Sequence, residues 1–157
     1  MERMMDTTAV ELSNLLPTAI QAREKLALAE AEKAAAALRQ KERADAEKKA
    51  LIEALSKPTG ISEEEAFKRA AAFISRAIGD GLTEVEVLRF PCALCSDDGR
   101  AINNQEPGWE TTLTGLPKEM YDFWHKHLRS RGYKAKAEVV TFPNGIPGDI
   151  GMTVSWL

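Results

Sequence analysis

The sequence is poor in several features that would point to a function by themselves. It has only two cysteines, Cys92 and Cys95, which excludes a disulfide framework. It has no apolar run of the eighteen or more residues that cross a bilayer, and residues 1–16 lack the basic and apolar pattern of a secretory signal. We therefore expect a cytoplasmic protein without a membrane partner, in which both cysteines are reduced.

An excess of positive charge is absent as well. The net charge of the 157 residues is -3, whereas dedicated nucleic-acid-binding proteins are usually strongly basic. The sequence contains no GxxxxGK[ST] phosphate loop, no GxGxxG, no HExxH and no GxSxG motif. We therefore predict no cofactor and favour a non-enzymatic protein, with enzymatic activity left open.

The N-terminal third of the sequence is a long run of helix-forming residues. Residues 17–57 are mostly Ala, Glu, Lys, Leu, Arg and Gln, with no glycine and no proline after Pro17. Pro17 suits a first helical turn, and Ser13 or Asn14 could cap it. Because the Pro58-Thr59-Gly60 stretch ends such a helix, we predict a helical extension over residues 1–57 and a domain over residues 58–157.

Apolar residues of the extension recur at near-heptad spacing, which predicts a weak oligomer seam. We favour a coiled coil between chains. The alternatives are a helix that folds back on its own domain, a hairpin broken near residues 40–46, and a single solvated helix supported by charge pairs. The predicted seam consists of Ile20, Ala27, Ala31, Ala34, Leu38, Leu51 and Leu55.

Two amphipathic helices are predicted in the domain. The first begins with a capping box at residues 62–65, and its apolar residues between Phe67 and Ile78 recur every three or four positions. The second runs from Pro117 to Ser130, with an apolar stripe and a glycine after its end. Both helices are expected to cover a sheet.

The first predicted strand covers residues 83–90. It places Val85 and Val87 on one face and then Leu88 and Phe90 on the other. We interpret this change of face as a strand that enters a region covered on both sides.

Two further strands are predicted at residues 133–142 and 150–156. They are joined by a loop rich in Pro, Gly and Asn, so they should pair antiparallel. The element order is a long Ala-rich helix followed by α-β-α-β-β. This order predicts an α+β fold with a small mixed or antiparallel sheet covered by helices.

The segment between the first strand and the second domain helix, residues 90–109, carries the densest chemistry. A CxxC pair, Cys92 and Cys95, is compatible with redox catalysis or with a zinc site completed by Asp97 or Asp98 or by a second copy of the chain. His125 and His127 lie on opposite sides of the predicted helix, so both cannot bind one metal. We favour the interpretation that the cysteines are small buried residues and that no metal is bound.

Polar residues follow the cysteines and form the candidate ligand or partner site. Long loops in compact domains are often functional, and the planar guanidinium of Arg100 could bind a carboxylate or a phosphate. Asp and Asn also form turns through their own backbone, which is the alternative interpretation. The candidate residues are Asp97, Asp98, Arg100, Asn103 and Asn104.

A basic segment at residues 118–136 has six Lys and Arg residues against two acids. It could attract nucleic acid, but a solvated surface is favoured, and pairing with the acidic segment 58–117, within one chain or between chains, is an alternative. The cations considered for nucleic acid are Lys126, Arg129, Arg131, Lys134 and Lys136.

Together these patterns favour a non-enzymatic cytoplasmic interaction or adaptor protein. It is expected to self-associate, or to dock on a partner protein, through the N-terminal helix. The alternative is a ligand-binding or enzymatic domain that uses the polar segment 92–110.

Overall fold

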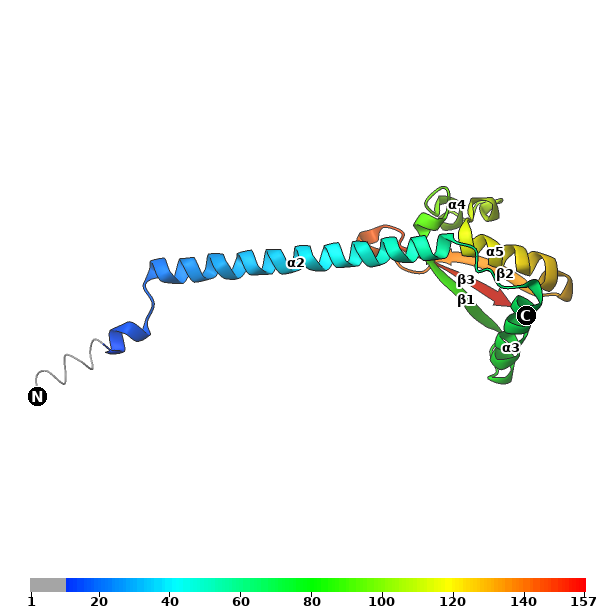
Figure 1. Ribbon diagram of the computed structural model, residues 1–157, viewed down its shortest axis with the longest axis horizontal. Coiled ribbons are helices and arrows are strands. Elements are labelled where there is room, and N and C mark those ends of the chain that lie inside the picture. Colours follow the sequence, from blue (N-terminus) through cyan, green and yellow to red (C-terminus); the bar gives the residue numbers. More distant parts are fainter. Residues whose placement is uncertain (1–10) are drawn as a thin grey trace, which may run out of the picture. The chain divides into compact units, whose positions relative to one another are not determined.

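The computed structural model describes residues 11–157 (Figure 1). The chain divides into two compact units between Ala46 and Glu47. The described elements confirm the α+β fold, with a long helix followed by shorter helices and one sheet. The α-helices are α2 (Ala19–Ser56), α3 (Glu63–Gly79), α4 (Arg100–Asn103) and α5 (Gly115–Phe123), and the strands are β1 (Glu84–Pro91), β2 (Lys134–Val139) and β3 (Asp149–Ser155).

The helix α2 starts with a capping box at Thr18. The Thr18 hydroxyl accepts a hydrogen bond from the backbone N–H of Gln21 at 3.2 Å, and the Gln21 side-chain oxygen accepts from the backbone N–H of Thr18 at 2.9 Å. The prediction that Ser13 or Asn14 caps this helix is wrong, because residues 11–15 are themselves helical and the chain breaks around Pro17. The alternative of a hairpin broken near residues 40–46 is also wrong, since α2 continues through them.

The end of α2 belongs to the second unit. Ile52 and Leu55 are partly buried and pack against the main core cluster. Gly115, at the start of α5, has φ +59°, and a Cβ atom there would overlap the backbone of Leu55 and Ser56. Because this contact needs a glycine, the last turn of α2 is fitted closely to α5. The second compact unit begins at Glu47, inside the helix.

The sheet has three strands in the order β1-β3-β2. Both pairings are antiparallel, which confirms the pairing predicted for β2 with β3. The central strand β3 carries the apolar residues Ile150, Met152 and Val154, all of which are buried. These three alternate residues define the core face of the sheet.

A β-bulge explains the change of face in β1. The register of β1 against β3 shifts around Val87, so that Leu88 lies opposite Met152 and Phe90 opposite Ile150. One extra residue moves all later side chains to the other face, and Leu88 and Phe90 thereby reach the core face. The change of face therefore comes from the bulge and is not evidence that β1 enters a region covered on both sides.

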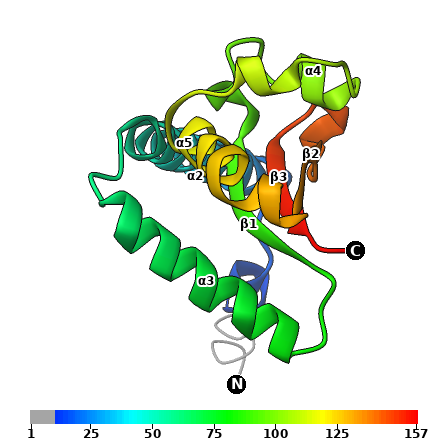
Figure 2. The same ribbon diagram turned by 90° about the vertical axis from the view of Figure 1, so that its right-hand side faces the viewer.

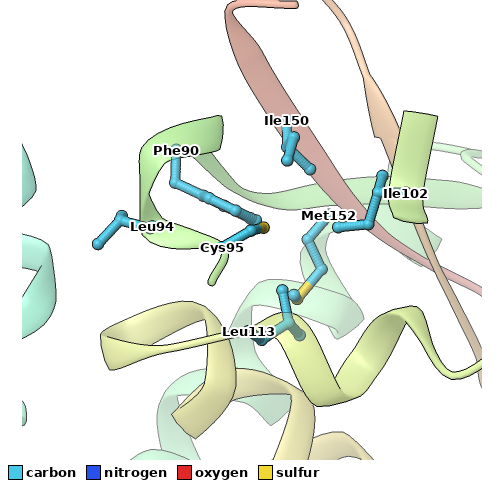
Figure 3. Packing of buried hydrophobic residues seen from close by; sticks show 7 residues of the cluster. All are labelled: Phe90, Leu94, Cys95, Ile102, Leu113, Ile150 and Met152. Carbon is cyan, nitrogen blue, oxygen red and sulfur yellow. The ribbon is translucent and has the colours of Figure 1, made fainter. Parts of the chain in front are cut away.

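The main core is built largely from the segment between β1 and α5 (Figure 3). This segment is ordered: it forms 3-10 turns at Cys92–Leu94 and Trp109–Thr112, the short helix α4, and a bridge between Cys95 and Leu113. Four of the seven buried cluster residues come from it. The cluster consists of Phe90, Leu94, Cys95, Ile102, Leu113, Ile150 and Met152.

The second predicted helix is divided into three parts. After α5 the chain forms a π-helical turn at Trp124–Leu128 and a 3-10 turn at Arg129–Arg131, and Gly132 ends it with φ 93°. A π turn adds a residue to the helical repeat, so it shifts the side chains that follow. Figure 2 shows α3 and α5 as separate helices beside the sheet.

Candidate functional site

The carboxylate of Asp97 organises its own turn. It accepts hydrogen bonds from the backbone N–H groups of Gly99, at 3.0 Å, and Ala101, at 2.9 Å. The turn passes through Asp98 and Gly99, which both have positive φ, 57° and 82°. This is the local turn chemistry that Asp and Gly favour, and it places Asp97 at the start of α4.

The remaining predicted site residues lie around α4. Arg100 turns toward Glu106, with 3.6 Å between its guanidinium and the carboxylate, and both side chains are exposed. Asn103 and Asn104, at the end of α4, are exposed as well. The structure therefore brings Asp97 and Asp98 into one turn and directs Arg100 to a different acid. None of the five lines the large cavity described below.

Both cysteines lie where the thiol form is favoured. Cys95 is 3% exposed and belongs to the core cluster, which confirms its interpretation as a small buried residue. Burial raises the pKa of the Cys95 thiol to about 11, and burial also raises the pKa of Cys92. Cys92 donates a hydrogen bond to the carbonyl of Pro147 at 3.4 Å. Thiolate chemistry at neutral pH is disfavoured at both positions.

The two histidines have different partners. The Nε2 atom of His127 lies 2.7 Å from a carboxylate oxygen of Glu63 on α3. His125 lies beside Arg129, with 2.9 Å between the ring nitrogen and the guanidinium. Within residues 11–157, no three His, Cys, Asp or Glu side chains gather in a way that could hold a metal ion.

Two cations of the basic segment pair with acids of segment 58–117. Lys126 binds Glu63, and Lys136 lies 3.2 Å from Glu84 across the sheet. The guanidinium of Arg131 stands 5.3 Å from the ring centroid of Phe67. Lys118 and Arg129 instead contact Asp122 and His125 of the basic segment itself, so pairing with segment 58–117 involves only part of the segment.

A cavity of about 580 Å³, which we call the α3–α5 groove, was not predicted from the sequence. It lies between α3, the segment from α5 to the π turn, and the core face of the sheet, which supplies Val87, Met152 and Val154. Two alanines of α3, Ala66 and Ala70, are among the residues that line it. Its apolar lining includes Ala66, Ala70, Phe73, Met120, Phe123 and Met152.

Polar contacts at two places beside the groove connect Thr59 and the start of α3 to the facing helical segment. The Thr59 hydroxyl donates to Glu119 at 2.6 Å. Glu63, at the start of α3, accepts from Lys126 and contacts His127 in the π turn. The hydrogen bond from Lys126, with that from His127 second, holds the pKa of Glu63 below its usual value. These contacts join parts of the chain some sixty residues apart.

The sequence contained one signal for the groove. Alanines at Ala66 and Ala70 fall on the inner face of α3, where larger side chains would fill the space toward α5. The predicted stripe of α3 is buried only in part, since Ile74 and Ala77 are buried while Ile78 is 48% exposed. Periodicity identifies the face that turns inward but does not say how far the next helix stands from it.

The predicted seam of α2 remains on the surface, with one exception. Leu55 packs on the main core together with Ile52, a residue that the predicted seam does not include. Leu26 and Leu28, also omitted, are 60% and 66% exposed. The exposed members of the predicted seam are Ile20, Ala27, Ala31, Ala34, Leu38 and Leu51.

Comparison with known proteins assigns the chain to no family. No protein-family model matches it, and no curated protein and no solved structure matches it either. Among the helices of residues 11–157, none combines the length and the apolar character that crossing a membrane requires. A function is therefore inferred from the surfaces of this chain alone.

Proposed function

We propose that the protein is a non-enzymatic, cytoplasmic interaction protein that self-associates through one face of α2. The observation that carries the proposal is the exposure of this helix: none of its residues is buried, and Ile20 and Leu38 are 64% and 56% exposed. Long helices in proteins are stabilised mainly by packing of an apolar face. A second copy of α2 would supply such packing.

The associating face is a stripe of five residues, which we call the α2 stripe. Successive helical residues are rotated by about 100°, so these five positions fall on one side of the helix. Alanine buries little apolar surface, and each buried carbon group stabilises the contact by only about 0.8 kcal/mol. Its small side chain does allow two helices to approach closely. Self-association is therefore expected to be weak and dependent on concentration. The α2 stripe consists of Ile20, Ala27, Ala31, Ala34 and Leu38.

A matched pair of substitutions tests this proposal in the full-length chain. Ala34→Glu places a charge in the α2 stripe, whereas Ala36→Glu places the same charge about 200° away around the helix. Light scattering after size exclusion, over a range of protein concentrations, should show a mass that rises toward the dimer for wild type and for Ala36→Glu. The Ala34→Glu chain should stay monomeric.

Two results would contradict self-association. A wild-type chain that stays monomeric at every concentration would remove the proposal. If both variants stay monomeric, an added charge on either side of α2 prevents association, and the α2 stripe is not the associating face. Docking on a different protein would then be the remaining use of α2.

The alternative function, ligand binding or catalysis by segment 92–110, has less support. The carboxylate of Asp97 is occupied by two backbone N–H groups, and Arg100 is directed to Glu106. Binding of nucleic acid also has less support, because Lys126 and Lys136 already pair with acids of the same chain.

A further inference from the structure

We propose that the α3–α5 groove binds an uncharged, largely apolar small molecule. Its volume of about 580 Å³ lies within the range of roughly 300–1,000 Å³ that is typical of small-molecule sites. The groove is bounded on three sides, by α3, by the segment from α5 to the π turn, and by the sheet. It lies entirely within the unit that begins at Glu47.

The lining explains why the occupant should be apolar. The groove is partly open to solvent, and its walls expose mainly apolar atoms. An apolar molecule that binds there removes this apolar surface from water, which is favourable. Here α3 contributes Ala66, Ala70 and Phe73, and the opposite wall contributes Met120 and Phe123. The methionine side chain is flexible enough to adjust to different apolar shapes.

The charges beside the groove explain why the occupant should be uncharged. Its two cations are both engaged: Arg69 lies 3.1 Å from Glu65, and Lys126 binds Glu63. Each cation is thus already neutralised by an acid beside it, and an anionic occupant would gain no unpaired positive charge. The affinity must therefore come from apolar surface removed from water.

The acids beside the groove are engaged as well. Glu119 accepts from the hydroxyl of Thr59, and Asp122 lies 3.7 Å from Lys118. A cationic group on the occupant would find no carboxylate without a partner among these. Neither sign of charge is therefore favoured at the mouth of the groove.

The same contacts favour a small molecule over a helix of another protein. An α-helix with its side chains is about 10–12 Å wide. One turn of such a helix occupies roughly 500 Å³, so the groove of about 580 Å³ has room for little more than one turn, and a longer helix would require α3 to move away from α5 and the π turn. That movement would break the contact of Thr59 with Glu119 and the contact of Glu63 with Lys126 and His127. A small molecule can occupy the groove with both contacts intact.

The first test uses N-phenyl-1-naphthylamine, an uncharged fluorescent probe, added to the full-length protein. Saturable binding is expected. Ala70→Phe, which fills the groove, should weaken binding at least tenfold. Ala72→Phe, two residues away on the same helix, is the matched control, because Ala72 is exposed and does not line the groove; it should leave binding unchanged. A charged relative, 1-anilinonaphthalene-8-sulfonate, should bind at least tenfold more weakly than the uncharged probe.

A second measurement does not depend on the folding of any variant. With methyl-labelled methionine in the wild-type chain, the uncharged probe should shift the NMR signals of Met120 and Met152, which line the groove, more than those of the other methionines. Lack of saturable binding, or equal binding by the Ala70→Phe and wild-type chains, would overturn the proposal. So would shifts that spare Met120 and Met152, or a sulfonate probe that binds as tightly as the uncharged one.

Discussion

The two parts of α2 have similar compositions but different surroundings. Residues 19–46 are exposed throughout, whereas residues 47–56 place Ile52 and Leu55 against the core. Both parts are helical, because Ala, Glu, Lys and Leu favour a helix in either setting. Local sequence thus determines that α2 is a helix, while tertiary contacts decide which of its apolar residues are structural. The apolar residues left without such contacts are the ones available to a partner.

The largest effect expected from this difference is on the stability of the domain. Phe90→Ala removes a side chain that is 0% exposed from the core cluster and should lower the free energy of unfolding by about 3–5 kcal/mol. Ile20→Ala, in the exposed part of α2, should change it by less than about 0.5 kcal/mol. Urea titration followed by tryptophan fluorescence, at a concentration where the chain is monomeric, measures both values. A comparable loss in the two variants would mean that residues 19–46 contribute to the folded domain.

Much of the fold could be predicted because strong local patterns agree with it. The capping box at Ser62 is observed, with the Ser62 hydroxyl accepting from the backbone N–H of Glu65 at 3.1 Å. The alternation in β2 and β3 also gives the correct inner residues, such as Ala137 and Met152. In these segments the period of the apolar residues is the same as the period of the structure.

The remaining features depend on non-local packing. The bulge at Val87 and the π turn at Trp124–Leu128 each add one residue to a regular repeat, and no single residue type marks either place. Segment 92–113 contains few periodic residues, yet Leu94 and Ile102 from this segment complete the core. The α3–α5 groove depends on the separation of two helices, which a sequence pattern does not encode.

A smaller effect should separate Leu55 from Leu51, which the seam prediction had treated alike. Leu55 packs on the core, so Leu55→Ala should destabilise the domain by about 1–2 kcal/mol, less than a fully buried leucine would. Leu51 is 47% exposed, and Leu51→Ala should change stability by less than about 0.5 kcal/mol. Urea midpoints of the two variants, measured side by side, test the distinction. Equal midpoints would show that the last turns of α2 do not belong to the domain.

The smallest effect concerns local and long-range charge contacts on α3. Glu63 contacts Lys126 and His127 on a distant part of the chain, whereas Glu64 pairs only with Lys68, one turn away at 3.3 Å. The hydrogen bond from Lys126 lowers the pKa of Glu63 below its usual value of 4.5 in the folded protein. The carboxylate therefore stabilises the fold above pH 4.5, and this contribution is lost as the pH falls through the lowered pKa.

Glu63→Gln should accordingly flatten the dependence of the melting temperature on pH between neutral pH and the acidic range below 4.5. Glu64→Gln is the matched control, because it removes the same charge from the first turn of the same helix but breaks only a local pair, which is usually weak. Thermal unfolding at a series of pH values compares the two variants with wild type. The melting-temperature profiles of the two variants should differ. If they coincide, the contact of Glu63 with the π turn adds no more stability than the pair of Glu64 with Lys68 within one helix.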